Sequence, residues 1–268
     1  MRITTRNAQF QVWQSLLTNR KTRQREGEFV VQGVRPITLA LEHRWEFRAV
    51  VFDAGRKLSR WAVGVLDRTP SARHVAMSPD LIAELGEKSE GAPELVAVVA
   101  SRSDAFDRIG TGEQQLTVVF DRPTQPGNIG SLVRSADAFG ATGVIVTGHA
   151  ADVYDPKSVR ASTGSLFAVP TIRIPSPRDV VDWAEKLRPR PLLVGTDESG
   201  DVDIDDHDFR GAHVVLIGNE TSGLSAAWRE AADRMVRIPM VGSASSLNAA
   251  NAATAVLYEA ARQRRRHG

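Results

Sequence analysis

The chain has 268 residues, of which 42% are hydrophobic and 25% are charged, and its formal net charge is +2. This composition is typical of a globular protein, and the absence of cysteine excludes disulfides, iron–sulfur clusters, cysteine-ligated zinc and thiolate nucleophiles. No apolar run approaches the roughly 20 residues that a membrane-spanning helix needs, and residues 1–10 lack the apolar core of a signal peptide, so we expect a cytoplasmic protein with no membrane contact.

The first 100 residues alternate short helices with short strands. Phe10, Trp13 and Leu16 recur at helical spacing, which predicts an amphipathic helix after Arg6. Further helices are expected after Pro36 and at residues 60–66 and 81–85, and strands at residues 29–31, 49–52, 75–76 and 95–100. We interpret this part as a small α/β module. The polar segment 101–112, which contains two glycines, is the expected linker.

The second half of the chain repeats a regular rhythm of strands and helices. Strands are expected at residues 116–120, 144–146, 169–174, 192–194, 214–217 and 235–238. Helices are expected at residues 129–139, 156–162, 180–187, 224–232 and 247–265. Continuous β-branched runs that alternate with helices predict a parallel sheet covered on both faces, and hence an α/β fold.

Charge is unevenly distributed along the chain. Residues 1–27 contain one acid, Glu26, against six basic side chains: Arg2, Arg6, Arg20, Lys21, Arg23 and Arg25. Contacts with RNA phosphates and solvated helix ends both explain such clusters. Residues 197–208 carry seven carboxylates and no lysine or arginine. Because this stretch lacks the spacing of a calcium-binding loop, we expect a solvated loop.

Three turns rich in glycine, asparagine and serine follow buried strands, within residues 120–140, 216–224 and 238–251. Each alone is ordinary turn chemistry. Together they predict a ligand site, because open α/β sheets bind ligands at the carboxyl ends of their strands. Arg134 follows Asn128 by six residues, which we interpret as roughly the same side of one helix. Neither a dinucleotide fingerprint nor a P-loop nor a nucleophile elbow is present, and the scattered histidines predict no metal site.

The three turns carry recognisable motifs in order. The first contains Asn128-Ile129-Gly130, Arg134 and Phe139-Gly140, the second Ile217-Gly218-Asn219-Glu220 and Gly223, and the third Ile238-Pro239-Met240 and Ser245-Ser246-Leu247-Asn248. They resemble the motifs of the SpoU family of RNA ribose 2′-O-methyltransferases in the SPOUT superfamily, over residues 116–262. A closer likeness, through RPTQPGNIG, GHAADVYDPKSVRASTGSLF and ITTRNAQFQVWQ, is to family members that methylate 23S rRNA and give resistance to a ribosome-targeting antibiotic.

The resemblance implies an architecture. Residues 1–105 would form an L30e-like RNA substrate-binding domain, and residues 113–268 a SPOUT methyltransferase domain with a deep trefoil knot. Such a protein would act as a homodimer and bind S-adenosylmethionine in the knot. The cofactor-binding positions that the resemblance implies are Thr196, Gly218, Asn219, Ile238, Met240, Ser246 and Leu247.

The resemblance also implies a mechanism, in which the 2′-hydroxyl of a ribose attacks the methyl group in line. Arg134 would stabilise the developing alkoxide, because its guanidinium is permanently charged and presents donors in a fixed fork. Asn128, Ser246 and Asn248 would orient Arg134 and the ribose. Glu220 would join them or would instead hold the loops together. The six basic residues of the first 27 would contact RNA phosphates.

Two other functions compete with this hypothesis. One is a non-catalytic RNA-binding protein on the same scaffold, against which the presence of Arg134, Glu220 and Asn248 argues. The other is a small-molecule or nicotinamide-dependent α/β enzyme, which the missing dinucleotide fingerprint disfavours.

Overall fold

The computed structural model describes residues 1–86 and 92–267, and the chain divides into two compact units. The first unit holds Met1–Arg102 and Tyr154–Ala168. The second holds Ser103–Val153 and the chain from Val169 onward. Most of the expected linker, from Ser103 onward, packs with the second unit, and residues 154–168 pack with the first unit although they lie in the second half of the sequence.

The first unit is built on a five-stranded mixed sheet in the order β1-β4-β3-β5-β2. β5 pairs antiparallel with β2 and β3, whereas β4 pairs parallel with β1 and β3. Every residue of β5 is buried, as its continuous apolar run predicts. The strands are β1 (Arg2–Ile3), β2 (Glu28–Gln32), β3 (Phe47–Asp53), β4 (Arg73–Met77) and β5 (Leu95–Ala100).

The first predicted helix is confirmed. Asn7 caps it by accepting a hydrogen bond from the Phe10 amide at 2.9 Å, and Phe10, Trp13 and Leu16 are buried. The helix expected after Pro36 begins earlier, at Val34, because proline is tolerated in a first helical turn. The helices of this unit are α1 (Ala8–Thr18), α2 (Arg20–Glu26), α3 (Val34–Glu42), α4 (Arg60–Arg68), α5 (Pro79–Leu85), α7 (Pro156–Ala161) and α8 (Ser165–Ala168).

The segment 154–168 is anchored in the first unit by aromatic and backbone contacts. The rings of Phe29 and Tyr154 stack with their centroids 4.5 Å apart. The indole of Trp45 donates a hydrogen bond to the Phe167 carbonyl at 3.0 Å. Gly164 has a φ of 100°, and a Cβ there would lie 3.3 Å from the Pro36 Cα, so the conformation and the close approach favour glycine.

The second unit is built on a seven-stranded sheet in the order β10-β12-β9-β11-β6-β7-β8. All its pairings are parallel, which confirms the predicted parallel sheet. Its central strands are buried along their whole length. The strands are β6 (Leu116–Asp121), β7 (Gly143–Thr147), β8 (Thr171–Arg173), β9 (Leu192–Thr196), β10 (Val202–Asp203), β11 (His213–Ile217) and β12 (Arg234–Arg237).

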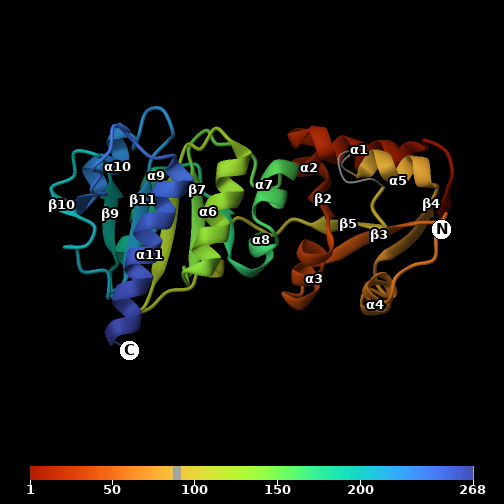
Figure 1. Ribbon diagram of the computed structural model, residues 1–268, viewed down its shortest axis with the longest axis horizontal. Helices are drawn as coiled ribbons and strands as arrows, with labels where there is room; N and C mark the ends of the chain where they lie inside the picture. Colours follow the sequence, from red (N-terminus) through yellow and green to blue (C-terminus); the bar gives the residue numbers. More distant parts are fainter. Residues whose placement is uncertain (87–91, 268) are drawn as a thin grey trace. The chain divides into compact units, whose positions relative to one another are not determined.

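The helices of the second unit cover this sheet. Val180 and Ala184 of α9 and Trp228 of α10 join the apolar cluster that also contains Val119 and Leu216 of the sheet. α6 and α11 lie side by side (Figure 1), and the hydroxyls of Ser135 and Thr254 meet between them at 2.7 Å. The elements are η1 (Phe106–Arg108), α6 (Pro126–Ala138), α9 (Pro177–Lys186), α10 (Ala226–Ala231) and α11 (Ala249–His267).

The α6 helix begins three residues before its expected start at Ile129, because Pro126 is suited to a first helical position. Within the described part of the chain, no helix is both long and apolar enough to cross a bilayer. The expected trefoil knot stays a prediction.

Candidate active site

A pocket of about 510 Å³ lies at the carboxyl ends of β9, β11 and β12. Its walls come from three loops, which follow these three parallel strands, and from the start of α11. The structure brings into this pocket all seven residues expected to bind the cofactor: Thr196, Gly218, Asn219, Ile238, Met240, Ser246 and Leu247. Asp197, Glu198 and Arg229 also line it, and the sequence interpretation missed them.

The loop after β11 folds back on itself against the pocket. Asn219 and Gly223 exchange backbone hydrogen bonds of 3.0 and 3.1 Å, which makes a tight turn over residues 219–223. A Cβ at Gly218 would lie 2.4 Å from the Gly223 carbonyl carbon, and Gly223 itself has a φ of 61°. Both positions therefore require glycine, for close backbone approach and for a left-handed conformation respectively.

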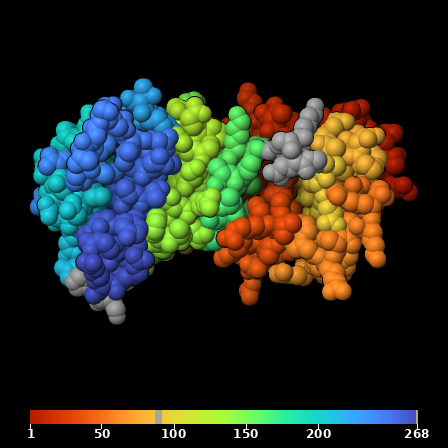
Figure 2. Space-filling model, viewed as in Figure 1, coloured from red at the N-terminus to blue at the C-terminus, as the bar shows by residue number. Residues whose placement is uncertain are grey.

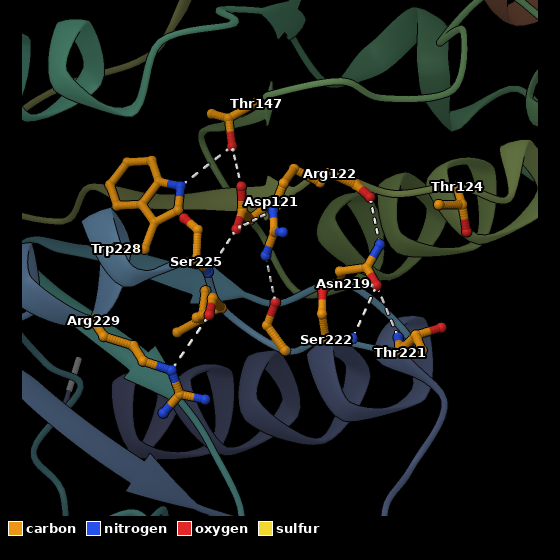
Figure 3. Close-up of polar contacts among 12 residues, drawn as sticks. Asp121, Arg122, Thr124, Thr147, Asn219, Thr221, Ser222, Ser225, Trp228 and Arg229 are labelled. Atoms are coloured by element: carbon orange, nitrogen blue, oxygen red, sulfur yellow. Dashed lines mark hydrogen bonds and ion pairs between the residues drawn. The ribbon is translucent and has the colours of Figure 1, made fainter.

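An ion pair at the end of β6 contacts this loop and holds it in place (Figure 3). Asp121 is 1% exposed, and Arg122 Nε lies 3.0 Å from its Oδ2 atom. Arg122 Nη2 donates to the Gly223 carbonyl at 3.0 Å, and the Asn219 amide donates back to the Arg122 carbonyl at 2.6 Å. Arg122 adopts a φ of 52°, unusual for a residue with a side chain. The loop is thus fastened to the neighbouring strand at two points.

The Asp121 carboxylate also reaches the start of α10. It accepts from the Ser225 amide at 2.9 Å and from the Thr147 hydroxyl at 3.1 Å (Figure 3). The Trp228 indole donates to that same hydroxyl at 3.3 Å. Each oxygen of this buried carboxylate accepts at least one hydrogen bond, so Asp121 acts as a brace between the ends of β6 and β7 and the start of α10. We refer to Asp121, Arg122, Thr147 and Ser225 as the Asp121 brace.

A second chain of hydrogen bonds joins the three sequence motifs. Asn128 at the start of α6 donates to Glu220 Oε1 at 2.8 Å, and Asn248 donates to Asn128 Oδ1 at 3.3 Å. The amide and the hydroxyl of Thr124 donate to Glu220 Oε2 at 3.4 and 3.2 Å. Burial raises the pKa of Glu220, but the hydrogen bonds from Asn128 and Thr124 outweigh it and hold the pKa below its usual value. Glu220 is therefore an ionised anchor of these loops.

The acidic stretch 197–208 is more structured than expected. Asp197 lines the pocket and forms an ion pair with Arg229 at 2.5 Å, and β10 lies within the stretch. Burial raises the pKa of Asp197, yet the hydrogen bonds from Ser199 and Arg229 leave it lower than usual. Asp203 pairs with Arg237 and Asp208 with Arg210. Five of its seven carboxylates, those of Glu198, Asp201, Asp205, Asp206 and Asp208, are exposed, as expected for a solvated loop, whereas Asp197 and Asp203 are half-buried and pair with arginines outside the acidic run.

Arg134 is exposed on α6 and is not among the residues that line the pocket. The expectation that it shares a side of the helix with Asn128 was wrong. Six residues advance an α-helix by about 600°, which leaves the two side chains roughly 120° apart around the helix axis. The structure therefore joins Asn128, Glu220 and Asn248 in one chain of contacts and leaves Arg134 outside it.

The basic residues near the N-terminus do not form one exposed set. Arg2, Arg6, Lys21 and Arg25 are exposed and Arg20 is half-buried. Arg23 is only 4% exposed, donates to the Leu16 carbonyl at 2.7 Å and lies 3.5 Å from Asp155. Its guanidinium is committed within the first unit, so its expected contact with RNA was wrong. Among the described residues, no group of three or more potential ligands is placed to hold a metal ion.

Comparisons with known proteins agree with both halves of the chain. The model of the SpoU rRNA Methylase family matches residues 115–258, and that of the SpoU L30e-like domain matches residues 7–97. The chain is 62% identical over 266 residues to the 23S rRNA (uridine(2479)-2′-O)-methyltransferase of Streptomyces viridochromogenes, covering 98% of this chain and 92% of that protein.

Solved structures resemble the whole chain as well. The SpoU methyltransferase AviRb of Streptomyces viridochromogenes, in complex with the cofactor AdoMet, superposes with a TM-score of 0.92 at 61% identity, covering 97% of this chain and 98% of that one. An AdoMet-bound rRNA methyltransferase from Sinorhizobium meliloti gives a TM-score of 0.87 at 28% identity, covering 98% and 97%.

Proposed function

Since the chain belongs to the SpoU rRNA methylase family, we propose that it transfers the methyl group of S-adenosylmethionine to the 2′-hydroxyl of a ribose in 23S rRNA. The observation that carries this proposal is the pocket at the ends of β9, β11 and β12, where seven expected cofactor positions converge. The named activity of the Streptomyces viridochromogenes relative supports the choice of 23S rRNA. That substrate makes the cytoplasm the expected place of action.

The residues of the pocket fit S-adenosylmethionine. The pocket volume of about 510 Å³ is within the range of small-molecule binding pockets. Ile238, Met240 and Leu247 offer apolar contact for an adenine ring, and the carboxylates of Asp197 and Glu198 offer acceptors for hydroxyl and ammonium groups. When bound, the cofactor supplies a methyl group on a positively charged sulfur. We propose that the family's trefoil knot is what holds the three loops together.

On the acceptor side, we propose that Asn128, Ser246 and Asn248 orient the ribose, while Glu220 holds the loops. The lowered pKa of Glu220 supports this role, because an anchored carboxylate of low basicity is a poor proton acceptor. Arg134 supplies positive charge for the oxygen that loses its proton. Its exposure on α6 leaves the guanidinium open to the RNA.

RNA contact is proposed for Arg2, Arg6, Arg20, Lys21 and Arg25, which keep their side chains at least partly exposed. Arg6 and Arg25 have carboxylate partners, Glu84 and Glu26, at the surface. Such exposed pairs contribute little to stability, so their arginines are available to phosphates at low cost.

We further propose a homodimer that forms through the exposed surface of α6 and α11 (Figure 2). Tyr258 of α11 is 51% exposed, and its ring meets that of Phe139 edge to face at 5.8 Å. Exposed aromatic side chains are enriched at interfaces. Light scattering should give the mass of a dimer for the protein and a smaller mass for Tyr258→Glu. A monomer at micromolar concentration for the unchanged protein would contradict this.

The direct test of the activity is to incubate the purified protein with 23S rRNA and radiolabelled S-adenosylmethionine, and then to digest the RNA to nucleosides. We expect label in a single 2′-O-methylated nucleoside. An RNA-binding protein without activity would bind rRNA and leave it unlabelled, whereas a nicotinamide-dependent enzyme would bind neither substrate. Resistance to a ribosome-targeting antibiotic is a further expectation, checked by the drug sensitivity of cells that express the protein.

A further inference from the structure

The first unit has a pocket of its own, of about 440 Å³. Its walls are the turn from β2 into α3, the start of α4, residues 93–95 at the entry to β5, and α7. Trp61, Arg35 and Arg160 line it, together with Gln32, Val34 and Glu94. All of these residues belong to the same compact unit, and none belongs to the cofactor pocket. The α7 wall comes from the segment 154–168, and no residue of this segment has a role in the proposed methyl transfer.

Several contacts hold these walls in place. The Trp61 indole donates to the Thr38 hydroxyl at 3.0 Å, and this hydroxyl donates to the Val34 carbonyl at 2.7 Å. Arg35 Nε donates to the Thr163 carbonyl at 3.2 Å, which ties α3 to the end of α7. The aromatic wall and one basic wall are therefore fixed before any ligand arrives, which lowers the entropic cost of binding.

The chemistry of the lining is selective. Val34 is 58% exposed, although a branched apolar side chain gains by burial. Arg35 and Arg160 line the pocket together with a single acidic residue, Glu94. The Glu94 carboxylate already accepts hydrogen bonds from the amide and the hydroxyl of Ser59. The pocket thus combines an indole, an apolar surface and an excess of positive charge. Unpaired bases of RNA are recognised by this combination, through stacking on aromatic rings and arginine contacts to phosphate.

We propose that this pocket receives one unpaired nucleotide of the RNA substrate, with the base against Trp61 and the adjoining phosphate at Arg35 and Arg160. The inference rests on the proposed function, because it assigns to the RNA of that reaction a second point of attachment away from the methylated ribose. The pocket then selects a target by requiring an accessible base as well as an acceptor ribose.

The experiment combines kinetics with mapping of contacts. Trp61→Leu removes the aromatic face, Trp61→Phe keeps a ring, and Arg35→Gln removes one charge. Arg68→Gln, which changes an exposed arginine of α4 that does not line the pocket, is the matched control. We expect the KM for 23S rRNA to rise roughly 5- to 150-fold in Trp61→Leu, the range for loss of one base–aromatic stack. The rise should be smaller in Trp61→Phe, and Arg68→Gln should match the unchanged protein.

Two further readouts separate recognition from folding and from catalysis. The rate at saturating RNA and the Kd for S-adenosylmethionine should stay within twofold of the unchanged protein in every variant. Ultraviolet crosslinking of the unchanged protein to 23S rRNA, followed by mass spectrometry, should give a crosslinked peptide that contains Trp61 or Arg35. If Trp61→Leu fails to fold, Arg35→Gln and the crosslink still decide.

The inference is overturned if the unchanged protein methylates RNA while the variants keep its KM and no crosslink falls on the pocket. The proposed function then stands, and the pocket serves a peptide or a small molecule instead. If the unchanged protein transfers no methyl group to any rRNA, the proposed function fails, and this inference fails with it.

Discussion

The two pockets of the chain differ in what holds their walls. In the second unit, the Asp121 brace lies behind the loops, and its carboxylate is 1% exposed and accepts from several donors. In the first unit, the walls are tied by contacts of exposed or half-buried side chains such as Arg35 and Trp61. Substitutions at the buried supports of the second unit should therefore lower stability as well as cofactor binding. A flexible RNA suits a more open surface, where a side chain can be exchanged without loss of the fold.

Arg134 gives the largest expected effect and tests the contrast between buried supports and exposed functional side chains. It is exposed, and we propose that it stabilises charge during methyl transfer. In Arg134→Ala, we expect the methyl-transfer rate to fall by about 10²–10³, the typical cost of one electrostatic donor. The Kd for S-adenosylmethionine and the melting temperature should not change, because the side chain lies outside the pocket. Single-turnover kinetics and calorimetry measure both. A near-normal rate would remove Arg134 from the mechanism.

The exposed and buried members of the basic N-terminal set should behave in opposite ways. Arg23→Ala leaves the Leu16 carbonyl and Asp155 without their buried donor, and we expect a loss of about 2–3 kcal/mol in unfolding free energy. Lys21→Ala, two residues away and exposed, should cost less than about 0.5 kcal/mol. It should instead reduce the salt dependence of RNA binding by about one phosphate contact.

Urea unfolding and RNA titrations at several salt concentrations separate the two effects. Equal losses of stability in Arg23→Ala and Lys21→Ala would mean that the burial of Arg23 has no energetic role.

Asp121→Asn tests the brace itself. The amide keeps the size of the carboxylate but removes the charge that pairs with Arg122, and its NH2 group faces either the two donors Ser225 amide and Arg122 Nε or, after a flip, the Thr147 hydroxyl. We expect a loss of about 1–3 kcal/mol in stability and weaker binding of S-adenosylmethionine, because the loop after β11 loses its support. Asp137→Asn, on the exposed side of α6, is the control. Unchanged cofactor affinity in Asp121→Asn would show that the loop keeps its position without the brace.

The smallest expected effect is a loss of stability at low pH, which involves His213 at the start of β11 and His207 before it. His207 Nε2 and His213 Nε2 are 3.2 Å apart, and His213 Nδ1 bonds the Gly211 carbonyl at 2.8 Å, so neutral rings satisfy both contacts. Burial lowers the pKa of both histidines. The unfolded chain therefore binds more protons below about pH 6.5, and stability should fall as the pH drops through that region.

We expect a loss of about 1 kcal/mol between pH 7 and pH 5.5 from the buried His213. Denaturant unfolding at a series of pH values checks this. His213→Gln should flatten the dependence, whereas His149→Gln, which changes an exposed residue, should leave it intact.

The main elements could be predicted because their cause is local. Buried apolar runs such as 116–120 and 214–217 form strands in any α/β context, and Pro126 marks a helix start. Some short elements were missed. One is β10, at Val202–Asp203, which forms by pairing with the distant strand β12, and no local sequence pattern indicates that pairing. α2 was missed because its charged sequence has no apolar periodicity.

The site was predictable only where motifs carried it. The seven expected cofactor positions followed from a family resemblance, and the structure brings these residues into one pocket. Asp121 and Arg122 were missed because their partners lie about a hundred residues further along the chain. The only local indication was two charged residues directly after a buried strand. Arg23 was misjudged because a charge in the sequence does not tell which side of a helix it occupies.

The central claim is that the loops after β9, β11 and β12 form one cofactor pocket. A crystal structure of the protein with S-adenosylhomocysteine, the demethylated product, tests it most directly. We predict that the ligand lies between the turn at residues 219–223 and the residues Met240 and Leu247, in contact with Thr196. A ligand bound elsewhere, or no binding at millimolar concentration, would contradict the account.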